Sequence, residues 1–450
     1  MAKKEEKEIL EELVVEEKKI DPAALVKKIK TPQLLRGFHD VLAEDQVYWE
    51  AIRQKVNSLA FAYSFDRMEL PILEPTELFV RSVGKQTDIV EKEMFQFQDQ
   101  SGANVVLRPE ATASTARAYI EHGMVDRPQP VKLFYEGPMF RYDRPQAGRY
   151  RQFNQFGFET FGSDEAIIDA QLILIADRFF RELGIPVTMQ VNSIGTTETR
   201  NEYKIELVAY YRTHRNEICE DCKRRLTRNP LRVLDCKVEG CRAVTANAPQ
   251  IIDWLDESSK EHFMRVLEYL EEVDVHYVLA PHLVRGLDYY SRTVFEIVPE
   301  GTDGSQSALG GGGRYDGLVE LLGGRPTPAC GFAIGIERTV AALKERQILP
   351  EVRGRRDIFL AQLGDVARRK GLALFEAFRQ EGVPVAEAFG KSALKAQLEL
   401  ADKYQVKYTL ILGQKEVLDG TIIIRDMESG VQETVDMNKV VGIIKKKLTE

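Results

Sequence analysis

The chain has 450 residues, of which 44% are hydrophobic and 29% are charged, and its formal net charge is -8. These values are typical of a globular protein with two or three domains, and the acidic balance argues against nonspecific nucleic-acid binding while leaving room for a local basic surface. No apolar run is long enough to span a bilayer, and the charged start MAKKEEKEIL lacks the apolar core of a signal peptide. We therefore predict a cytoplasmic location and no membrane contact.

Residues 1–30 mix Lys, Glu and aliphatic residues with acids and bases in near balance, which predicts a charged N-terminal extension. Helical spacing then begins in VYWEAIRQKVNSLAFAYSF, and a short apolar strand broken by Pro71 follows. EMFQFQDQSGANVVLRPE predicts a hairpin that turns at residues 99–102, and ATASTARAYIEHG predicts a short helix closed by Gly123.

Two further strands are predicted in KLFYEGPMFR and RQFNQFGFETF, with DRPQAGRY as the loop between them. Hairpins without regular β–α–β alternation indicate an antiparallel sheet, so the fold class predicted for residues 31–345 is α+β. Residues from about 195 to 280 have helical patterns and carry four of the five cysteines, which indicates an insertion. Strands return in YYSRTVFEIV, SQSALGGGG and ACGFAIG, and the helix ERTVAALKERQ follows.

The C-terminal part has a different rhythm. Residues 346–355 are predicted as a linker, and from residue 356 to 450 strands alternate with helices. The predicted strands are DIFLAQLG, PVAEAFG, YTLILG and TIIIRDM, and the predicted final helix is VDMNKVVGIIKKKL. This alternation indicates a small, separate α/β domain.

The strand RQFNQFGFETF carries polar residues where a buried strand would carry apolar ones. Because side chains alternate between faces, Gln155 and Glu159 share a face and bracket Gly157 across about 13 Å. We predict that a small polar molecule lies over this glycine and bonds both side chains. The alternative is a glycine placed for a bulge or a sheet crossing.

Arginines crowd the preceding loop, at Arg141, Arg144, Arg149 and Arg151. Arginine binds phosphate through fork-like hydrogen bonds, so a basic hairpin beside a polar pocket suits a phosphate-bearing substrate, although a solvated charged loop is the alternative.

Three later motifs add to the arginine-rich hairpin. RGLDYYSRTVFE supplies Arg285 with Tyr289 and Tyr290, and SALGGGGRYDGL places four glycines before Arg314 and Tyr315. A glycine run lets backbone approach a ligand, but it also fits a flexible turn. GFAIGIERT ends a strand and opens a helix with Glu337 and Arg338 in its first turn, where phosphate is attracted.

Four cysteines in the insertion, Cys219, Cys222, Cys236 and Cys241, form two pairs whose spacing fits a structural tetrahedral zinc site. The second pair, CKVEGC, is more widely spaced than usual, and His214 is a possible substitute ligand. Four free reduced thiols are the alternative.

Together these motifs resemble those of the histidyl-tRNA synthetase family of class II aminoacyl-tRNA synthetases. FRYDRPQAGRYRQFNQFGFE resembles motif 2, GFAIGIER resembles motif 3, and LVRGLDYYSRTVFE and ALGGGGRYDGL resemble the two histidine-specific signatures. The segment from Phe65 to Pro71 is similar to motif 1, which implies a homodimer. The C-terminal α/β part resembles the anticodon-binding domain. The match runs from about Thr31 to the C-terminus.

The resemblance implies a histidine–tRNA ligase that uses ATP with Mg²⁺, histidine and tRNA(His), and it implies roles at matching positions. Arg141 and Arg285 would be catalytic, with Arg141 at the α-phosphate of ATP and Arg285 in the place of a second metal ion. The remaining ATP-binding residues would be Arg149, Glu337 and Arg338. The histidine-binding residues would be Glu110, Thr112, Gln155, Glu159, Tyr289, Tyr290 and Tyr315. Arg144 and Gln146 would meet the acceptor end of the tRNA.

One departure from the family pattern is Ala111, where glycine is common. The alternatives to an enzyme are a non-catalytic synthetase-like regulatory subunit and a tRNA-sensing protein. The three arginines Arg141, Arg285 and Arg338, both histidine signatures and the C-terminal domain favour the enzyme.

Overall fold

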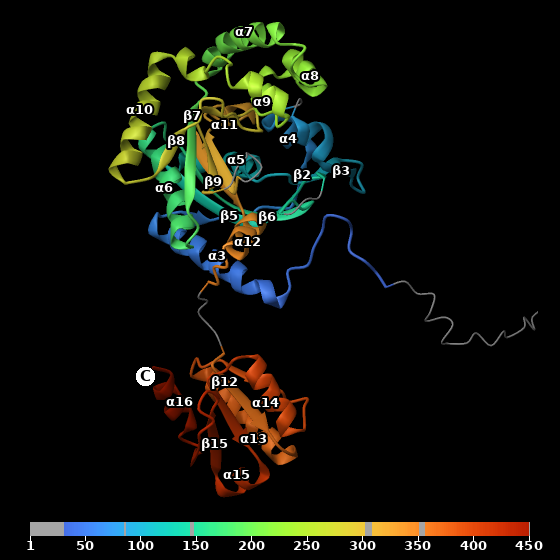
Figure 1. Cartoon of the computed structure of the whole chain (residues 1–450), viewed down its shortest axis with the longest axis vertical. Coiled ribbons are helices and arrows are strands. Elements are labelled where there is room, and N and C mark those ends of the chain that lie inside the picture. Colours follow the sequence, from blue (N-terminus) through green and yellow to red (C-terminus); the bar gives the residue numbers. More distant parts are fainter. Residues whose placement is uncertain (1–30, 85–86, 145–147, 302–307, 351–355, 450) are drawn as a thin grey trace, which may run out of the picture. The chain divides into compact units, whose positions relative to one another are not determined.

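The computed structural model of the chain describes residues 31–84, 87–144, 148–301, 308–350 and 356–449. The predicted extension at residues 1–30 and half of the predicted linker lie outside these residues. The chain divides into two compact units, Met1–Pro350 and Glu351–Glu450 (Figure 1). No helix in the described ranges is long and apolar enough to cross a membrane.

The first unit is built on an eight-stranded sheet with the order β1-β5-β6-β11-β10-β9-β7-β8. The six strands from β5 to β7 in this order pair antiparallel, and only the edge strands β1 and β8 pair parallel, so the predicted antiparallel sheet is confirmed. The strands are β1 (Asp66–Arg67), β5 (Val131–Phe140), β6 (Gln152–Phe161), β7 (Val187–Ser193), β8 (Tyr277–Leu279), β9 (Ser291–Pro299), β10 (Gly310–Arg314) and β11 (Ala329–Gly335).

Four helices cover one face of this sheet, namely α3 (Ala43–Ala62), α6 (Ala166–Glu182), α10 (Glu257–Glu272) and α12 (Ile336–Glu345) (Figure 1). Their apolar stripes bury the phenylalanines of the central strands. The ring of Phe158 in β6 stacks on Phe134 at 5.7 Å and on Phe332 at 5.3 Å between ring centroids. Because strand side chains alternate, this packing turns Gln155 toward the opposite face, as predicted.

The opposite face meets shorter elements. These are α4 (Thr76–Ser82), the π-helical turn η1 (Ile89–Glu93), α5 (Thr112–Glu121), η2 (Met124–Asp126), α11 (Leu318–Leu321) and a three-stranded sheet of β2 (Leu73–Pro75), β4 (Asn104–Leu107) and β3 (Phe95–Gln98). The hairpin predicted at residues 93–110 is the β3–β4 pair. The helix predicted after it is α5, and Gly123 follows it with φ +58°, as a closing glycine requires.

The inserted helices are α7 (Thr197–Thr213), α8 (Glu220–Arg228), η3 (Pro230–Val233), α9 (Glu239–Thr245) and η4 (Ile251–Trp254). The four cysteines lie among them, in one apolar cluster with Tyr203 and Tyr211. The last part of the predicted 195–280 segment belongs to the main body of the first unit, because α10 packs in the main core and β8 pairs with β7 at the edge of the main sheet.

The second unit has a five-stranded sheet in the order β13-β12-β14-β15-β16, with β12 parallel to both of its neighbours. Its elements are β12 (Ile358–Gln362), α13 (Asp365–Gln380), β13 (Val385–Glu387), α14 (Leu394–Lys403), β14 (Tyr408–Leu412), α15 (Gln414–Asp419), β15 (Thr421–Asp426), β16 (Gln432–Asp436) and α16 (Val440–Thr449). The predicted α/β alternation is confirmed. The final helix begins at Val440, and residues assigned to its start belong instead to β16.

Candidate active site

The polar face of the main sheet forms the floor of a cavity of about 480 Å³. Gly310 and Gly311 of β10, Ala333 and Gly335 of β11, and Gln155 of β6 contribute to this floor. The glycine run is therefore a central strand and not a flexible turn. Because Gly310 and Gly311 have no side chains, the backbone of β10 itself faces the cavity there, which leaves space for a ligand directly over the sheet.

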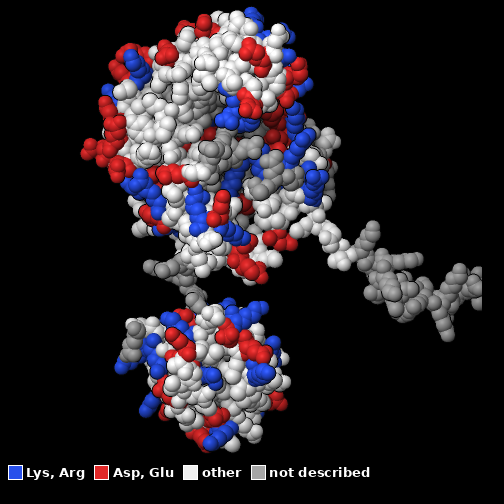
Figure 2. Space-filling view, in the orientation of Figure 1, with Lys and Arg blue, Asp and Glu red and all other residues white. Residues whose placement is uncertain are grey.

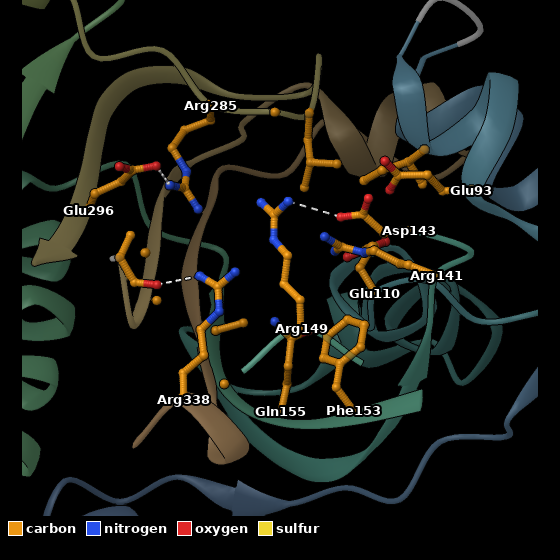
Figure 3. Close-up of a pocket in the computed structure, with 18 of the residues that line it drawn as sticks. Glu93, Glu110, Arg141, Asp143, Arg149, Phe153, Gln155, Arg285, Glu296 and Arg338 are labelled. Atoms are coloured by element: carbon orange, nitrogen blue, oxygen red, sulfur yellow. Dashed lines mark hydrogen bonds and ion pairs between the residues drawn. The ribbon is translucent and has the colours of Figure 1, made fainter. Parts of the chain in front are cut away.

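Five arginines line this cavity, of which four (Arg141, Arg149, Arg285 and Arg338) belong to the motifs singled out in the sequence and the fifth is Arg232, whereas the surface of the protein in Figure 2 shows acidic and basic residues interspersed. Figure 3 shows Arg285 reaching in from one wall, Arg338 from below it, Arg149 between the walls and Arg141 opposite. These four arginines come from the loop before β9, the start of α12, and the two ends of the β5–β6 loop. Fixed positive charge from distant parts of the sequence thus meets in one place.

Arg285 is positioned by the strands beneath it. Its guanidinium donates to the carboxylate of Glu296 on β9 and lies 5.9 Å above the ring of Tyr290, whereas its Nε is buried without a hydrogen-bond partner in the described ranges. A Cβ on Gly311 would lie 2.9 Å from this guanidinium, so glycine is needed there. Burial opposes the charge, but the carboxylate of Glu296 and the hydroxyl groups of Tyr290 and Tyr289 together outweigh it and raise the pKa of Arg285. A buried, unpaired donor on a permanent cation suits an anionic ligand.

The other three arginines are held by short contacts that leave donors free. Arg141 Nε donates to the carbonyl of Pro109 at 2.8 Å, and Arg149 pairs with Asp143 at 3.0 Å. Arg338 donates to the carbonyl of Ala308. Burial, and then the nearby charges of Arg149 and Arg141, lower the pKa of Arg338. Mutual repulsion of this kind would be relieved by a polyanion.

Glu159 is fully buried beneath the cavity and does not form its wall. Its carboxylate accepts hydrogen bonds from Thr112 at 2.7 Å, from Tyr135 at 3.3 Å and from Tyr315. Gly331 makes room for it, since a Cβ there would overlap Glu159 Oε2. Burial, partly offset by these hydrogen bonds, raises the pKa of Glu159 to about 8.

The space above Gly157 differs from the prediction. We expected an open gap there, but the phenol of Tyr135 lies over this glycine, 2.4 Å from where a Cβ would stand. Tyr135 is the direct cross-strand partner of Gly157 and was missed by the sequence analysis. Its position follows only from the register in which the two strands pair, which alternation within a single strand does not give.

Tyrosines close the deep end of the cavity. Tyr289 and Tyr290 line it, with ring centroids 4.7 Å apart, and Tyr315 lies behind them at 5.5 Å from Tyr289. Thr112 also lines this end. The rings of Tyr289 and Tyr290 thus line a small cup beside the arginines, and Tyr315 and the buried carboxylate of Glu159 lie behind it.

Two predicted carboxylates have partners within the protein. Glu110 lines the cavity and accepts the backbone N–H groups of Thr112 at 2.7 Å and Ala113 at 3.0 Å, which caps α5. Glu337 also lines it, and accepts from the backbone and side chain of Asn154. Burial raises the pKa of both carboxyl groups. Glu110 therefore holds the backbone at the start of α5, and Glu337 holds the backbone of β6 at Asn154.

Of the two predicted acceptor-end residues, Arg144 is exposed and lies outside the cavity lining, and its backbone N–H donates to Asp143 at 2.6 Å. Gln146 lies outside the described residues. The lining also includes Glu93, Asp143 and Glu296, which the sequence analysis did not single out. Single acidic residues carry no spacing signal, so nothing in the sequence marked them.

The four insertion cysteines come together as predicted. Their Sγ atoms all lie within 4.8 Å of one another, and Cys219 and Cys236 are 3.9 Å apart. His214 does not belong to this group, and its Nδ1 lies 2.9 Å from Thr213 Oγ1 and 3.1 Å from the carbonyl of Tyr210. The cluster therefore consists of four cysteine sulfur atoms, and His214 is not part of it.

An antiparallel sheet with arginines gathered over one face, joined to a separate α/β unit, is the architecture expected of class II aminoacyl-tRNA synthetases. A family model described as histidyl-tRNA synthetase matches residues 37–339, and one described as an anticodon-binding domain matches residues 357–447. The chain therefore belongs to the histidyl-tRNA synthetase family, which confirms the resemblance and the predicted fold class.

Similar proteins agree with this assignment. A protein from Dehalococcoides mccartyi named histidine–tRNA ligase is 47% identical over 414 residues, covering 92% of this chain and 99% of the relative. One of the same name from Fervidobacterium nodosum is 44% identical over 420 residues, covering 93% and 99%. The crystal structure of apo histidyl-tRNA synthetase from S. aureus matches with a TM-score of 0.77 and 34% identity, covering 92% of this chain and 99% of that one.

Proposed function

We propose that this protein is a histidine–tRNA ligase, which activates histidine with ATP and transfers it to the 3′ end of its tRNA. The observation that carries the proposal is the convergence of Arg141, Arg285 and Arg338 on one cavity beside a small aromatic cup. Membership of the family and relatives of that name support it. A regulatory or tRNA-sensing relative would not need this set of phosphate-directed groups.

The proposed chemistry needs fixed charge and no protein nucleophile. The carboxylate of histidine attacks the α-phosphorus of ATP in line, pyrophosphate leaves, and the histidyl-adenylate then passes its acyl group to the terminal ribose of the tRNA. Synthetases of this kind use Mg²⁺, which offsets charge on the phosphates. Negative charge grows on the α-phosphate in the transition state, and preorganised guanidinium groups stabilise it.

For ATP, we propose that Arg141 and Arg285 act at the α-phosphate and Arg338 at the γ-phosphate, with Arg149 and Glu337 close by. The unpaired Nε of Arg285 supports this role. Arg149 is paired with Asp143 across the cavity mouth, so it is available to a nucleotide once that exposed ion pair opens.

For histidine, we propose that the cup recognises both nitrogens of neutral imidazole. One nitrogen donates to the carboxylate of Glu159, and a tyrosine hydroxyl, from Tyr290 or its neighbours Tyr289 and Tyr315, donates to the other. Glu110, Thr112 and Gln155 would hold the amino group. Since Glu159 is buried, its bond to the ligand requires a shift of the rings above it.

The activity is tested by ATP–pyrophosphate exchange measured with each of the twenty amino acids, followed by charging of tRNA(His). Exchange with histidine alone, together with charging, is the expected result. Histidine binding without exchange would instead favour a regulatory or sensing protein, and exchange with another amino acid would overturn the assignment of the cup.

Partners outside the cavity are also proposed. Arg144 and Gln146 would contact the acceptor end of the tRNA, and the second unit, which matches an anticodon-binding model, would contact the anticodon. The cytoplasmic location stays a prediction.

We propose a homodimer. One support is the similarity of residues 65–71 to motif 1. The other is a group of large apolar side chains near this segment that are exposed to solvent in the single chain, and a second subunit would cover them. They are Phe61, Ile72 and Leu73. Sedimentation should give a mass near twice 51.2 kDa, and a mass near 51.2 kDa at micromolar concentration would refute the dimer.

We also propose that the four cysteines hold a structural zinc ion. Four thiolates at the usual Zn–S length of about 2.3 Å lie about 3.8 Å apart, close to the 3.9 Å between Cys219 and Cys236. Three of the four residues are buried, which suits a closed site.

We expect about one zinc per chain in protein purified under reducing conditions without chelator, and little zinc in Cys222→Ser. Loss of the ion should also lower the melting temperature. Cys330→Ser is the control, because this fifth cysteine lies in the main core away from the cluster. Metal-free wild-type protein would contradict the proposal.

A further inference from the structure

The insertion contributes directly to a wall of the catalytic cavity, through Arg232, Asp235 and Lys237. Arg232 lies between Asp88 on one side and Gly286, next to Arg285, on the other, and its side chain is only 14% exposed. Arg232 and Asp235 lie between α8, which contains Cys222, and Cys236, and Lys237 follows Cys236 directly, so members of the cysteine cluster anchor the segment on both sides.

On the side of Arg141, two arginines of the insertion contact Asp88. Arg225 donates to Asp88 Oδ2 at 3.3 Å, Arg232 lies 3.5 Å from the same oxygen, and Arg225 also donates to the carbonyl of Arg232 at 3.4 Å. Asp88 immediately precedes η1. The carbonyl of Glu93 at the end of η1 accepts the N–H of Tyr142 at 2.7 Å, next to Arg141. Asp88 is therefore connected, through η1 and this hydrogen bond, to the end of β5, where Arg141 lies.

Toward the opposite wall, the same segment touches the loop of Arg285. The guanidinium of Arg232 is 3.2 Å from the place of a Cβ on Gly286, and the side-chain amide of Asn229 donates to Asp288 at 3.0 Å. Gly286 and Asp288 lie between Arg285 and Tyr289. One short segment of the insertion thus contacts both walls that carry α-phosphate arginines.

We propose that Arg232 is a positioning residue that holds the Arg141 wall and the Arg285 wall at a fixed separation, chiefly through Asp88. In-line attack depends on the placement of both guanidinium groups, and small displacements of charge-stabilising groups reduce turnover far more than they reduce binding. The expected loss of kcat rests on the proposed function, whereas the positioning of the two walls is tested without any activity measurement.

Replacing Arg232 with alanine should lower kcat for histidine-dependent pyrophosphate exchange about 10-fold, while KM for ATP and for histidine changes much less. Active-site titration corrects for any unfolded fraction. The control is Arg224→Ala on the neighbouring inserted helix α8, since Arg224 pairs only with the exposed Asp221 among the described residues. Equal kcat values in the two variants would overturn the proposal.

The route through Asp88 is tested by a double-mutant cycle with Asp88→Asn. Because the two residues act as a unit, we expect the double variant to lose no more kcat than the more severe single variant. Losses that multiply would overturn the role of Asp88.

Hydrogen–deuterium exchange separates this inference from the proposed activity. R232A should raise amide exchange in both residues 87–93 and residues 286–290, whereas R224A should change neither. Unchanged protection in R232A would overturn the positioning role even if the enzyme is active. Failure of the wild-type protein in pyrophosphate exchange would overturn the function and leave this measurement decisive for Arg232.

Discussion

Arg285→Ala is expected to reduce histidine-dependent pyrophosphate exchange by about 10²–10³-fold, equivalent to about 3–4 kcal/mol of transition-state stabilisation. Its guanidinium is held over the glycine strand by Glu296, with a buried Nε that has no partner in the described part of the chain. If this group stabilises charge that develops on the α-phosphate, the loss should fall mainly on kcat. The measurement is steady-state exchange with ATP and histidine varied separately.

A suitable control is Arg53→Ala, which removes an arginine–glutamate pair, Arg53 with Glu136 at 2.9 Å, outside the cavity lining. Both variants should melt cooperatively and near the wild-type temperature. A folded Arg285→Ala protein with exchange close to that of Arg53→Ala would show that Arg285 does not act on the phosphate.

Glu159→Gln is expected to lower kcat/KM for histidine by about 100-fold or more. A cup built around two hydrogen bonds to imidazole penalises a mismatched group strongly, because buried polar atoms are left unpaired. Glutamine can place an amide N–H₂ donor at the position where the carboxylate oxygen would accept a hydrogen bond from the imidazole N–H. ATP binding should change little, because Glu159 lies outside the lining that the four arginines share.

The pKa of Glu159, raised by burial to about 8, predicts a pH dependence that the variant removes. Above about pH 7 free imidazole is already neutral, so a further rise of kcat/KM for histidine toward pH 8 to 9 would report deprotonation of Glu159. In Glu159→Gln this rise should be absent. A wild-type profile that is flat across this range would argue against carboxylate recognition.

The same shift affects stability. Between about pH 4.5 and 8 the folded protein keeps the Glu159 proton that the unfolded chain has lost, so this group's contribution to the free energy of unfolding falls as pH rises. We expect the unfolding free energy of Glu159→Gln, relative to wild type, to increase across that window. Glu77→Gln is the control, because Glu77 is exposed and should show no such trend.

Much of the fold could be predicted from local pattern. The β3–β4 hairpin, the strands β5 and β6, and the alternating C-terminal unit follow from period-two and period-3.6 spacing with turn signals between them. β16 was missed because QETVD has little apolar character, and its burial pattern in the structure is correspondingly exposed. Strands at a sheet edge need little apolar surface, so they leave a weak pattern.

The candidate site was predicted only in part, and the errors have one origin. Alternation placed Gln155, Gly157 and Glu159 on one face, but it could not show that Tyr135 from the neighbouring strand covers the glycine. Nor could it show that Glu159 is buried beneath Thr112 and Tyr315. Cross-strand neighbours and depth below a surface are properties of the packed sheet.

By itself, the sequence determined the family, the two-unit organisation and the residue types of the cavity, because those depend on composition, local periodicity and motif spacing. Only the tertiary structure decided that Arg141, Arg285 and Arg338 meet, that four glycines form a strand beneath them, and that four cysteines converge. Positions almost 200 residues apart become neighbours through strand pairing and core packing, which depend on the whole chain and leave no mark in any single segment.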